Sequence, residues 1–305
     1  MFYVSLETGV DTLWLLDSSY PYVTDETPTF NASDPDSSAI NSGQAFSSVT
    51  GDSAVYGKKY YDIVEYFFPI NQSFGAVDRI EGPWYDPGFE DVISDLGNQP
   101  VTVDSAPILN MFALYPEMPR YYVMAIGEYL ENGTAVDTGC LTFGAFPDLF
   151  CKTNPIASAS LYYDYTYNSL SFNLDSFGYG SQRVNGGTAK MDSGLPMILV
   201  PLEAFNLLFN AIQPDYDYEL QLYTTDCSNA GVLDDLVFTI GNVDLNVPST
   251  VYIIDLSLGD GRCVVKFSLS NDFTTPFALG LPFTDTFCVK WDIDNNTISM
   301  FNFVD

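Results

Sequence analysis

The chain has 305 residues, of which 47% are hydrophobic and 15% aromatic, a composition that excludes a disordered chain and leaves room for two compact domains. With 40 acidic residues against 10 basic ones, the net charge of -30 argues against nucleic acid or an anionic membrane as a partner. The sequence contains no histidine, which excludes hydrolases that pair histidine with serine or cysteine, HExxH zinc sites and most metal sites that use imidazole.

The first predicted element is a strand that ends in an acid and a tight turn. In the segment FYVSLETGVDTLW, residues 2–14, apolar and polar residues roughly alternate until Thr8 and Gly9 break the pattern. This strand would carry the carboxylate of Glu7 inward, which is costly unless the carboxylate is paired or hydrogen-bonded. Glu7 is therefore either well satisfied or part of a site.

Short strands are expected along the rest of the chain. Segments rich in β-branched and aromatic residues alternate with clusters of Gly, Pro, Asn, Asp and Ser, which is typical of an all-β protein. The polar segment 127–139 is expected to be a crossover between two halves. Residues 292–300, DIDNNTISM, predict a hairpin that turns at Asn295 and Asn296, and they lack the glycine that an EF-hand loop needs at its sixth position.

Two helices are expected between the strands. The clearer one is VPLEAFNLLFNAI, residues 200–212, with a proline near its first turn and a glutamate that suits its N-terminus. Its predicted apolar face consists of Phe205, Leu208, Phe209 and Ile212. The second helix is expected in APILNMFAL, residues 106–114.

Two polar motifs permit other interpretations. The segment GDSAVYGK, residues 51–58, is similar to a phosphate-binding loop, but it has one residue too many between its glycines and Lys59 in place of Ser or Thr. The acidic run SDPDSS, residues 33–38, is either a solvated loop or an adventitious calcium site. We expect no resident metal and no cofactor.

The cysteines and the glycosylation motifs favour a secreted protein. The five cysteines are widely spaced without a CxxC pair, which favours structural disulfides over zinc. Four N-x-S/T motifs support the same compartment, at Asn31, Asn71, Asn132 and Asn295. Met1 is not followed by a signal segment, so we expect a signal peptide to have been removed or to be missing from this sequence.

A long-range repeat suggests a chemistry. SLETGV near the start is echoed by AKMDSGL at residues 189–195, and each motif places an acid, a small hydroxyl residue and a glycine after an apolar approach. Two carboxylates brought together from two halves can share one proton, so that one acts as a base and the other as an acid on a water molecule.

With this repeat, the sequence resembles the pepsin-like aspartic proteases, and the resemblance looks closest to nematode members. It covers nearly the whole chain, because further landmarks follow in the order and spacing of the family. These landmarks are AFSSVTGDSAVYGKKYYDIV for the flap hairpin, DVISDLG, CLTFGAF, MDSGLPMILVP, LYTTDCSNAGVLDDLVFTIGN, YIIDLSLGDGRC and FALGLPFTDTFCVKWDIDNNTISMFNF.

The resemblance implies an all-β, bilobal fold with a peptide cleft between two lobes related by a pseudo-twofold axis. The N-terminal lobe, residues 1–150, would carry the flap and the first active-site turn, and the C-terminal lobe, residues 151–305, the second. The family's opening strands are expected before residue 1. The resemblance also implies the disulfides Cys227–Cys263 and Cys151–Cys288. Cys140 is then a buried strand residue, a reactive thiol or a link to another chain.

The resemblance assigns the catalytic acids to Glu7 and Asp192. The residues that support these acids or cover a substrate are Thr8, Gly9, Thr50, Gly51, Asp52, Ser193 and Gly194.

The sequence departs from the family pattern in four places, the last of which covers two residues. Glu7 replaces an aspartate, Val10 a serine that hydrogen-bonds the catalytic carboxylate, and Thr50 the flap tyrosine. After the second triplet, Leu195 and Pro196 stand where the family usually continues with a hydroxyl residue. Because such surrounding hydrogen bonds orient a catalytic group, losing several usually removes its function.

Two functions are compatible with these residues. The first is a secreted pseudo-protease with weak or no endopeptidase activity, a monomer whose cleft binds a peptide or protein. The second is an acid endopeptidase that uses a dyad of Glu7 and Asp192 with an activated water. Self-repulsion at a net charge of -30 is relieved when carboxylates protonate, which favours an acidic environment. Together with the cysteines and the glycosylation motifs, this predicts a secreted protein of the extracellular space or of an acidic digestive or lysosome-like compartment.

Overall fold

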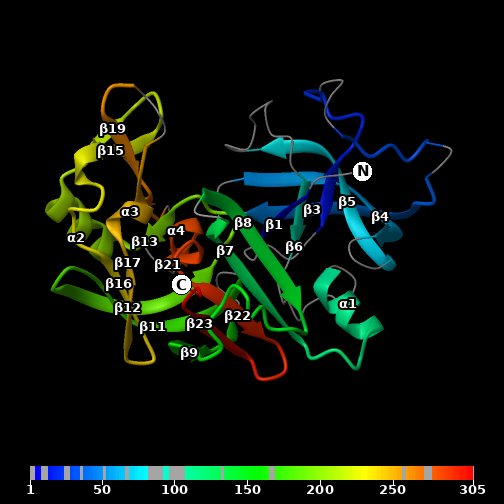
Figure 1. Ribbon diagram of the computed structural model, residues 1–305. Helices are drawn as coiled ribbons and strands as arrows, with labels where there is room; N and C mark the ends of the chain where they lie inside the picture. Colours follow the sequence, from blue (N-terminus) through cyan, green and yellow to red (C-terminus); the bar gives the residue numbers. More distant parts are fainter. Residues whose placement is uncertain are drawn as a thin grey trace. The chain divides into compact units, whose positions relative to one another are not determined.

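A computed structural model divides the chain into two compact units, Met1–Glu117 and Met118–Asp305, which are described here one at a time (Figure 1). The structure describes residues 4–7, 13–23, 28–34, 37–50, 53–65, 69–81, 92–95, 107–131, 134–164, 169–255, 259–270 and 277–304.

The first unit is built on a four-stranded sheet with the strand order β2-β5-β4-β3. Neighbouring strands are antiparallel except for β2 and β5, which are parallel. A separate parallel pair joins β1 to β6. The elements of this unit are β1 (Val4–Glu7), β2 (Trp14–Leu16), β3 (Ile40–Thr50), β4 (Ser53–Glu65), β5 (Pro69–Glu81), β6 (Val92–Asp95) and α1 (Pro107–Leu114).

The strand β2 is buried on both faces. Trp14 and Leu16 pack in one hydrophobic cluster with Val55 and Val77, while Leu13 and Leu15 pack in another cluster that contains Phe30 and Phe74. Side chains alternate between the two faces of a strand, so a strand covered on both faces reads as a continuous apolar run. This explains why LWLL contains no polar residue.

The described residues of the second unit form three sheets. The largest has the order β17-β16-β11-β12-β21-β13-β20, with β10 paired to β11. Its strands are β10 (Tyr162–Asp164), β11 (Ser169–Tyr179), β12 (Gln182–Met191), β13 (Ile198–Val200), β16 (Leu236–Ile240), β17 (Val243–Val247), β20 (Phe267–Leu269) and β21 (Phe277–Leu279). The helix α2 (Leu202–Ile212) packs against β11 and β12.

The two smaller sheets have four and five strands. The four-stranded sheet consists of β14 (Asp215–Asp217), β15 (Leu222–Asp226), β19 (Arg262–Val265) and β18 (Ile253–Ile254). The five-stranded sheet consists of β8 (Thr134–Phe143), β7 (Tyr121–Glu131), β22 (Cys288–Asp292), β23 (Thr297–Phe301) and β9 (Ala157–Ser160). Short helices complete the unit: η1 (Cys227–Asn229), α3 (Ser249–Tyr252) and α4 (Leu281–Thr284).

Most of the predicted elements are confirmed. The chain is mostly strand, α1 and α2 form where two helices were predicted, and β3 and β4 form the flap hairpin. The hairpin of β22 and β23 turns through residues 293–296. Residues 53–58 of the phosphate-loop motif lie in the strand β4, which does not support the loop before a helix that phosphate binding needs.

Two predictions are wrong. Residues 127–139 form no crossover, because β7 and β8 pair along their whole length as an antiparallel hairpin in one sheet. Phe209 does not belong to the buried face of α2, because its side chain is 38% exposed and packs on Phe205 and Tyr223, whereas Ala204 is buried. The lobe boundary between residues 150 and 151 stays a prediction, and the contacts of the chain divide it after Glu117.

The two disulfides that the resemblance implied are present, Cys151–Cys288 and Cys227–Cys263. Cys140 is a free thiol on β8, opposite Ala125 of β7, and burial raises its pKa. A half-buried thiol of this kind is a packing residue rather than a reactive nucleophile. No helix in the described parts of the chain is long and apolar enough to span a membrane.

Candidate active site

The two predicted acids occupy the same place in a repeated topology. Glu7 ends β1, which runs parallel to β6, and Asp192 directly follows β12, which runs parallel to β21. The next strands repeat the relation, because β2 is parallel to β5 and β13 is parallel to β20. Each acid therefore stands at the carboxyl end of a strand that has a parallel neighbour. This supports the long-range repeat seen in the sequence.

The backbone of the second turn is tied to the end of β21 and to the first residue of α4. The N–H of Asp192 donates to the carbonyl oxygen of Leu279 at 3.0 Å, and the N–H of Leu281 donates to the carbonyl oxygen of Leu195 at 2.8 Å. Within the turn, the N–H of Leu195 donates to the carbonyl oxygen of Asp192 at 3.1 Å. Asp192 and Ser193 are buried, whereas Gly194 is exposed. These bonds fix the position of the Asp192 carboxylate.

Close packing against this turn requires a glycine at position 280. A Cβ atom there would lie 2.1 Å from the carbonyl oxygen of Met197 and 2.4 Å from that of Leu195. The role of Gly280 was not predicted, although FALGLPF served as a family landmark. The available signal was a glycine directly after an apolar strand segment, which often marks a close approach of backbone.

The Asp192 carboxylate has two different oxygens. The ammonium of Lys190 donates to its Oδ2 at 3.0 Å, and the Lys190 side chain is 19% exposed. The other oxygen, Oδ1, is buried and has no hydrogen-bond partner among the residues that the structure describes. An unpaired buried carboxylate oxygen is costly, so this atom is available to a proton, a water or a ligand hydroxyl.

Lys190 is a second residue that the sequence analysis missed. Lys190 and Asp192 are two positions apart at the end of β12, and residues with this spacing on a strand point to the same face. The signal was the lysine in AKM, which interrupts the apolar approach to the acid.

The first turn and the flap tip are described only in part. Glu7 lies opposite Asp95 of β6, a neighbouring acid that sequence reasoning did not identify. Thr50 ends β3 opposite Ser53, so two residues connect the strands of the hairpin. The remaining predicted residues of these two segments lie outside the described part of the chain, namely Thr8, Gly9, Val10, Gly51 and Asp52.

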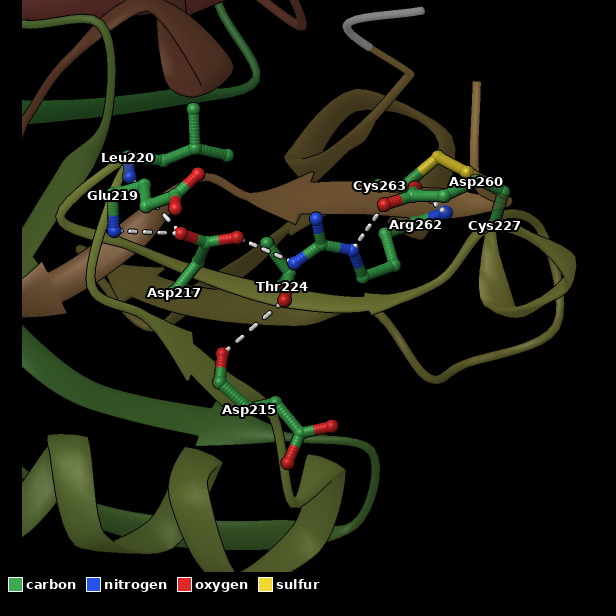
Figure 2. Close-up of polar contacts among 9 residues, drawn as sticks. All are labelled: Asp215, Asp217, Glu219, Leu220, Thr224, Cys227, Asp260, Arg262 and Cys263. Carbon is green, nitrogen blue, oxygen red and sulfur yellow. Dashed lines mark hydrogen bonds and ion pairs between the residues drawn. A yellow bond between two sulfur atoms is a disulfide. The ribbon is translucent and has the colours of Figure 1, made fainter. Parts of the chain in front are cut away.

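A separate charged cluster ties the β14–β15 turn to β19. Figure 2 shows Arg262 between Asp217 and Asp260, with Nε donating to Asp260 Oδ2 at 2.6 Å and a terminal nitrogen donating to Asp217 Oδ2. The N–H groups of Glu219 and Leu220 donate to Asp217 Oδ1 at 2.9 Å and 3.0 Å.

These contacts shift the pKa values of the three charged side chains. The backbone N–H of Leu220 and the Arg262 guanidinium hold the pKa of Asp217 below its ordinary value, and the Arg262 backbone and side chain lower that of Asp260. The two carboxylates in turn raise the pKa of Arg262. All of these donors belong to the cluster, so its role is to hold two turns together.

Within the described ranges, one group of neighbouring side chains is of the kinds that bind metal ions, namely Cys227, Asp255 and Cys263. Its two sulfur atoms are joined in a disulfide, so they offer no thiolate to a metal.

Comparisons with known proteins agree with the repeated topology. Residues 1–302 match the family described as eukaryotic aspartyl protease. The chain is 27% identical to Aspartic protease 1 of Caenorhabditis elegans over 322 aligned residues, which cover 97% of this chain and 77% of that protein. It is 31% identical to Aspartic protease 17 of the same nematode over 134 residues, 43% of this chain and 34% of that protein.

The structure is also similar to the crystal structure of the aspartic proteinase from Irpex lacteus. The TM-score is 0.77 at 19% sequence identity, and the match covers 98% of this chain and 89% of that chain. At this identity the similarity concerns the fold.

Proposed function

Because the chain belongs to the eukaryotic aspartyl protease family, we propose that it is a pepsin-like aspartic peptidase homologue that keeps a peptide-binding cleft and has weak or no endopeptidase activity. The observation that carries this proposal is the pair of strand-end acids, because one of the two is a glutamate, Glu7, where the family has an aspartate. Glutamate is longer by one methylene, so its carboxylate overshoots the shared-proton geometry or folds back onto the water site. A misplacement of about 1 Å can cost about 100-fold in rate.

Two further departures act in the same direction. Val10 cannot donate the hydrogen bond that a serine gives to the first carboxylate, and Thr50 lacks the aromatic ring with which the family's flap covers the substrate. The lost groups orient the reacting atoms, so chemistry suffers more than binding. The second turn, in contrast, retains a buried Asp192 and its backbone hydrogen bonds. This combination supports a binding protein derived from a protease.

The proposed partner is a peptide or protein in a cleft between the two lobes, and the proposed protein is a monomer. We place it outside the cell or in an acidic digestive or lysosome-like compartment. Two disulfides support an oxidising compartment. The sequon residues Asn31, Asn71 and Asn295 are exposed, as glycosylation requires.

A second candidate function is acid endopeptidase activity with a dyad of Glu7 and Asp192. The observation in its favour is the buried Oδ1 of Asp192, which has no partner among the described residues and could accept the shared proton or hold the water. In this mechanism the water attacks the scissile carbonyl while one carboxylate takes its proton and the other protonates the leaving amine. Coupled acids titrate as a pair, so neither role is assigned to one residue.

A cleavage assay separates the two functions. Unfolded casein would be incubated with the protein between about pH 3 and 6, with and without a statine-type inhibitor, and the products identified by mass spectrometry. We expect no inhibitor-sensitive products from the folded wild type, and products only when Glu7→Asp, Val10→Ser and Thr50→Tyr are combined. Inhibitor-sensitive cleavage by the wild type that disappears in Asp192→Ala would establish the endopeptidase instead.

A further inference from the structure

We propose that Lys190 is a positioning residue that suppresses catalysis by holding Asp192 in an ion pair. The inference rests on the proposed function, because it names a second cause for the weak hydrolysis in addition to Glu7. It concerns the side of the site that keeps the family's aspartate. Lys190 would therefore act independently of the substitutions in the first turn and the flap.

Lys190 carries a charge in the middle of a sheet. Its strand neighbours are Ser171 on β11 and Ala278 on β21, and the ammonium lies 3.0 Å from Asp192 Oδ2. The side chains of the pair are only 19% and 3% exposed, so water screens their attraction less than it screens an ion pair on the surface. A charge in such a place requires a partner, and Asp192 is the ion-pair partner of Lys190 within the described residues.

The ion pair interferes with the chemistry of a shared proton. Two acids acting on water need one proton between them, which leaves the pair with a single negative charge. The positive charge of the Lys190 ammonium stabilises an ionised Asp192, so the two acids no longer need a shared proton to reduce their repulsion. The ammonium also occupies Oδ2, so that Oδ1 alone is open to a proton, a water or a ligand hydroxyl.

A second lysine–aspartate pair with the same two-residue spacing has a purely structural role. On β22, Lys290 donates to Asp292 Oδ2 at 2.9 Å, with side chains 22% and 14% exposed. There, Asn295 donates from its backbone and its side chain to Asp292 Oδ1, each at 3.0 Å. Both oxygens of Asp292 are thus satisfied, whereas Oδ1 of Asp192 has no hydrogen-bond partner in the described part of the chain. This difference assigns the Lys190 pair to a site and the Lys290 pair to a turn.

The test uses the chain in which Glu7→Asp, Val10→Ser and Thr50→Tyr restore the family residues. Lys190→Met, Lys190→Gln, Lys190→Arg and Lys290→Met are added singly to this background, and kcat and KM are measured on unfolded casein. We expect Lys190→Met to raise kcat about tenfold or more with little change in KM, because general acid–base catalysis contributes factors of this size or larger. Lys190→Arg keeps the charge and should stay slow, and Lys290→Met should leave kcat unchanged.

Lys190→Gln protects the test against a folding defect, because it removes the charge and keeps a hydrogen-bond donor beside Asp192. Circular dichroism and thermal unfolding establish which variants fold. If a folded Lys190→Met or Lys190→Gln variant is no faster than the background, or if Lys190→Arg is equally fast, the proposal is wrong. Loss of the fold in both neutral variants would also overturn it, since Lys190 would then serve stability alone. Efficient, inhibitor-sensitive cleavage by the unmodified chain that disappears in Asp192→Ala would instead refute the proposed function, so the two failures are distinguishable.

Discussion

The chemistry of the second turn depends on one buried carboxylate, that of Asp192. The sequence predicted only some of the residues around it. The motif Asp-Ser-Gly drew attention to Asp192, which directly follows β12 in the structure. The motif does not include Lys190, which lies two residues before Asp192. Its side chain reaches Asp192 because residues two apart on a strand point to the same face. The need for Gly280 was hidden for a similar reason, since the backbone that it approaches comes from residues far away in the chain.

Replacing Gly280 by alanine should loosen the turn that carries Asp192. The new Cβ would lie 2.1 Å from the carbonyl oxygen of Met197, so the backbone must move. We expect the free energy of unfolding to fall by about 1 to 3 kcal/mol, the usual cost of overpacking, in urea titrations followed by circular dichroism. Gly187→Ala is the matched control, because a Cβ at position 187 of β12 meets no atom within 4 Å. Equal stability of the two variants would contradict the packing described for Gly280.

Among the elements, the β22–β23 hairpin offers a pH-dependent prediction. Burial raises the pKa of Asp292, but hydrogen bonds from Lys290 and Asn295 outweigh it and hold this pKa below its ordinary value. A carboxyl whose pKa is lowered by folding contributes stability above its unfolded pKa, and this contribution is lost as the pH falls through the folded value. The lysine–aspartate pair therefore stabilises the hairpin at neutral pH and ceases to do so in strong acid.

We expect Lys290→Met to lower the free energy of unfolding by about 1 to 3 kcal/mol at neutral pH, the cost of losing a hydrogen bond to a charged group. The difference from the wild type should shrink once the pH falls below the ordinary aspartate pKa of about 3.9. Urea unfolding at pH 7 and in a series of acidic buffers measures both values. Lys58→Met, at an exposed lysine of β4, provides the control for removal of a charge. A difference that stays constant over this pH range would exclude the pair as its origin.

Helices and strands could be predicted where the local sequence pattern determines them. Features that depend on tertiary packing were harder to predict. The helix α2 formed as its apolar spacing and its proline indicate, yet Phe209 packs at the edge of the helix on Tyr223. The segment 127–139 lies in the β7–β8 hairpin, and its composition alone does not distinguish a hairpin from a linker. The hairpin of β3 and β4 followed from the family resemblance, and the β22–β23 hairpin followed from its turn residues Asn295 and Asn296.

For the whole molecule, the family fold and both disulfides followed from the order of landmarks along the chain. The net charge of -30 is a property of the complete sequence, in which 40 acidic residues stand against 10 basic ones. Self-repulsion of this size weakens the compact state at neutral pH, which gives covalent links a larger share in holding the chain together.

The two disulfides should therefore differ in their contribution to global stability. Cys151–Cys288 joins residues 137 positions apart, whereas Cys227–Cys263 joins residues only 36 apart. In the chain-entropy model the longer loop is worth about 5 kcal/mol and the shorter one about 4 kcal/mol, because a longer loop restricts the unfolded chain more.

We expect the double variant Cys151→Ala with Cys288→Ala to melt at a lower temperature than the variant Cys227→Ala with Cys263→Ala. Differential scanning calorimetry measures both, and Cys140→Ala, which leaves both disulfides intact, provides the control for loss of a cysteine side chain. The opposite order would show that the disulfide beside Arg262 stabilises its turns by more than loop closure. In that case the charged cluster of Arg262, Asp217 and Asp260 depends on the covalent link next to it.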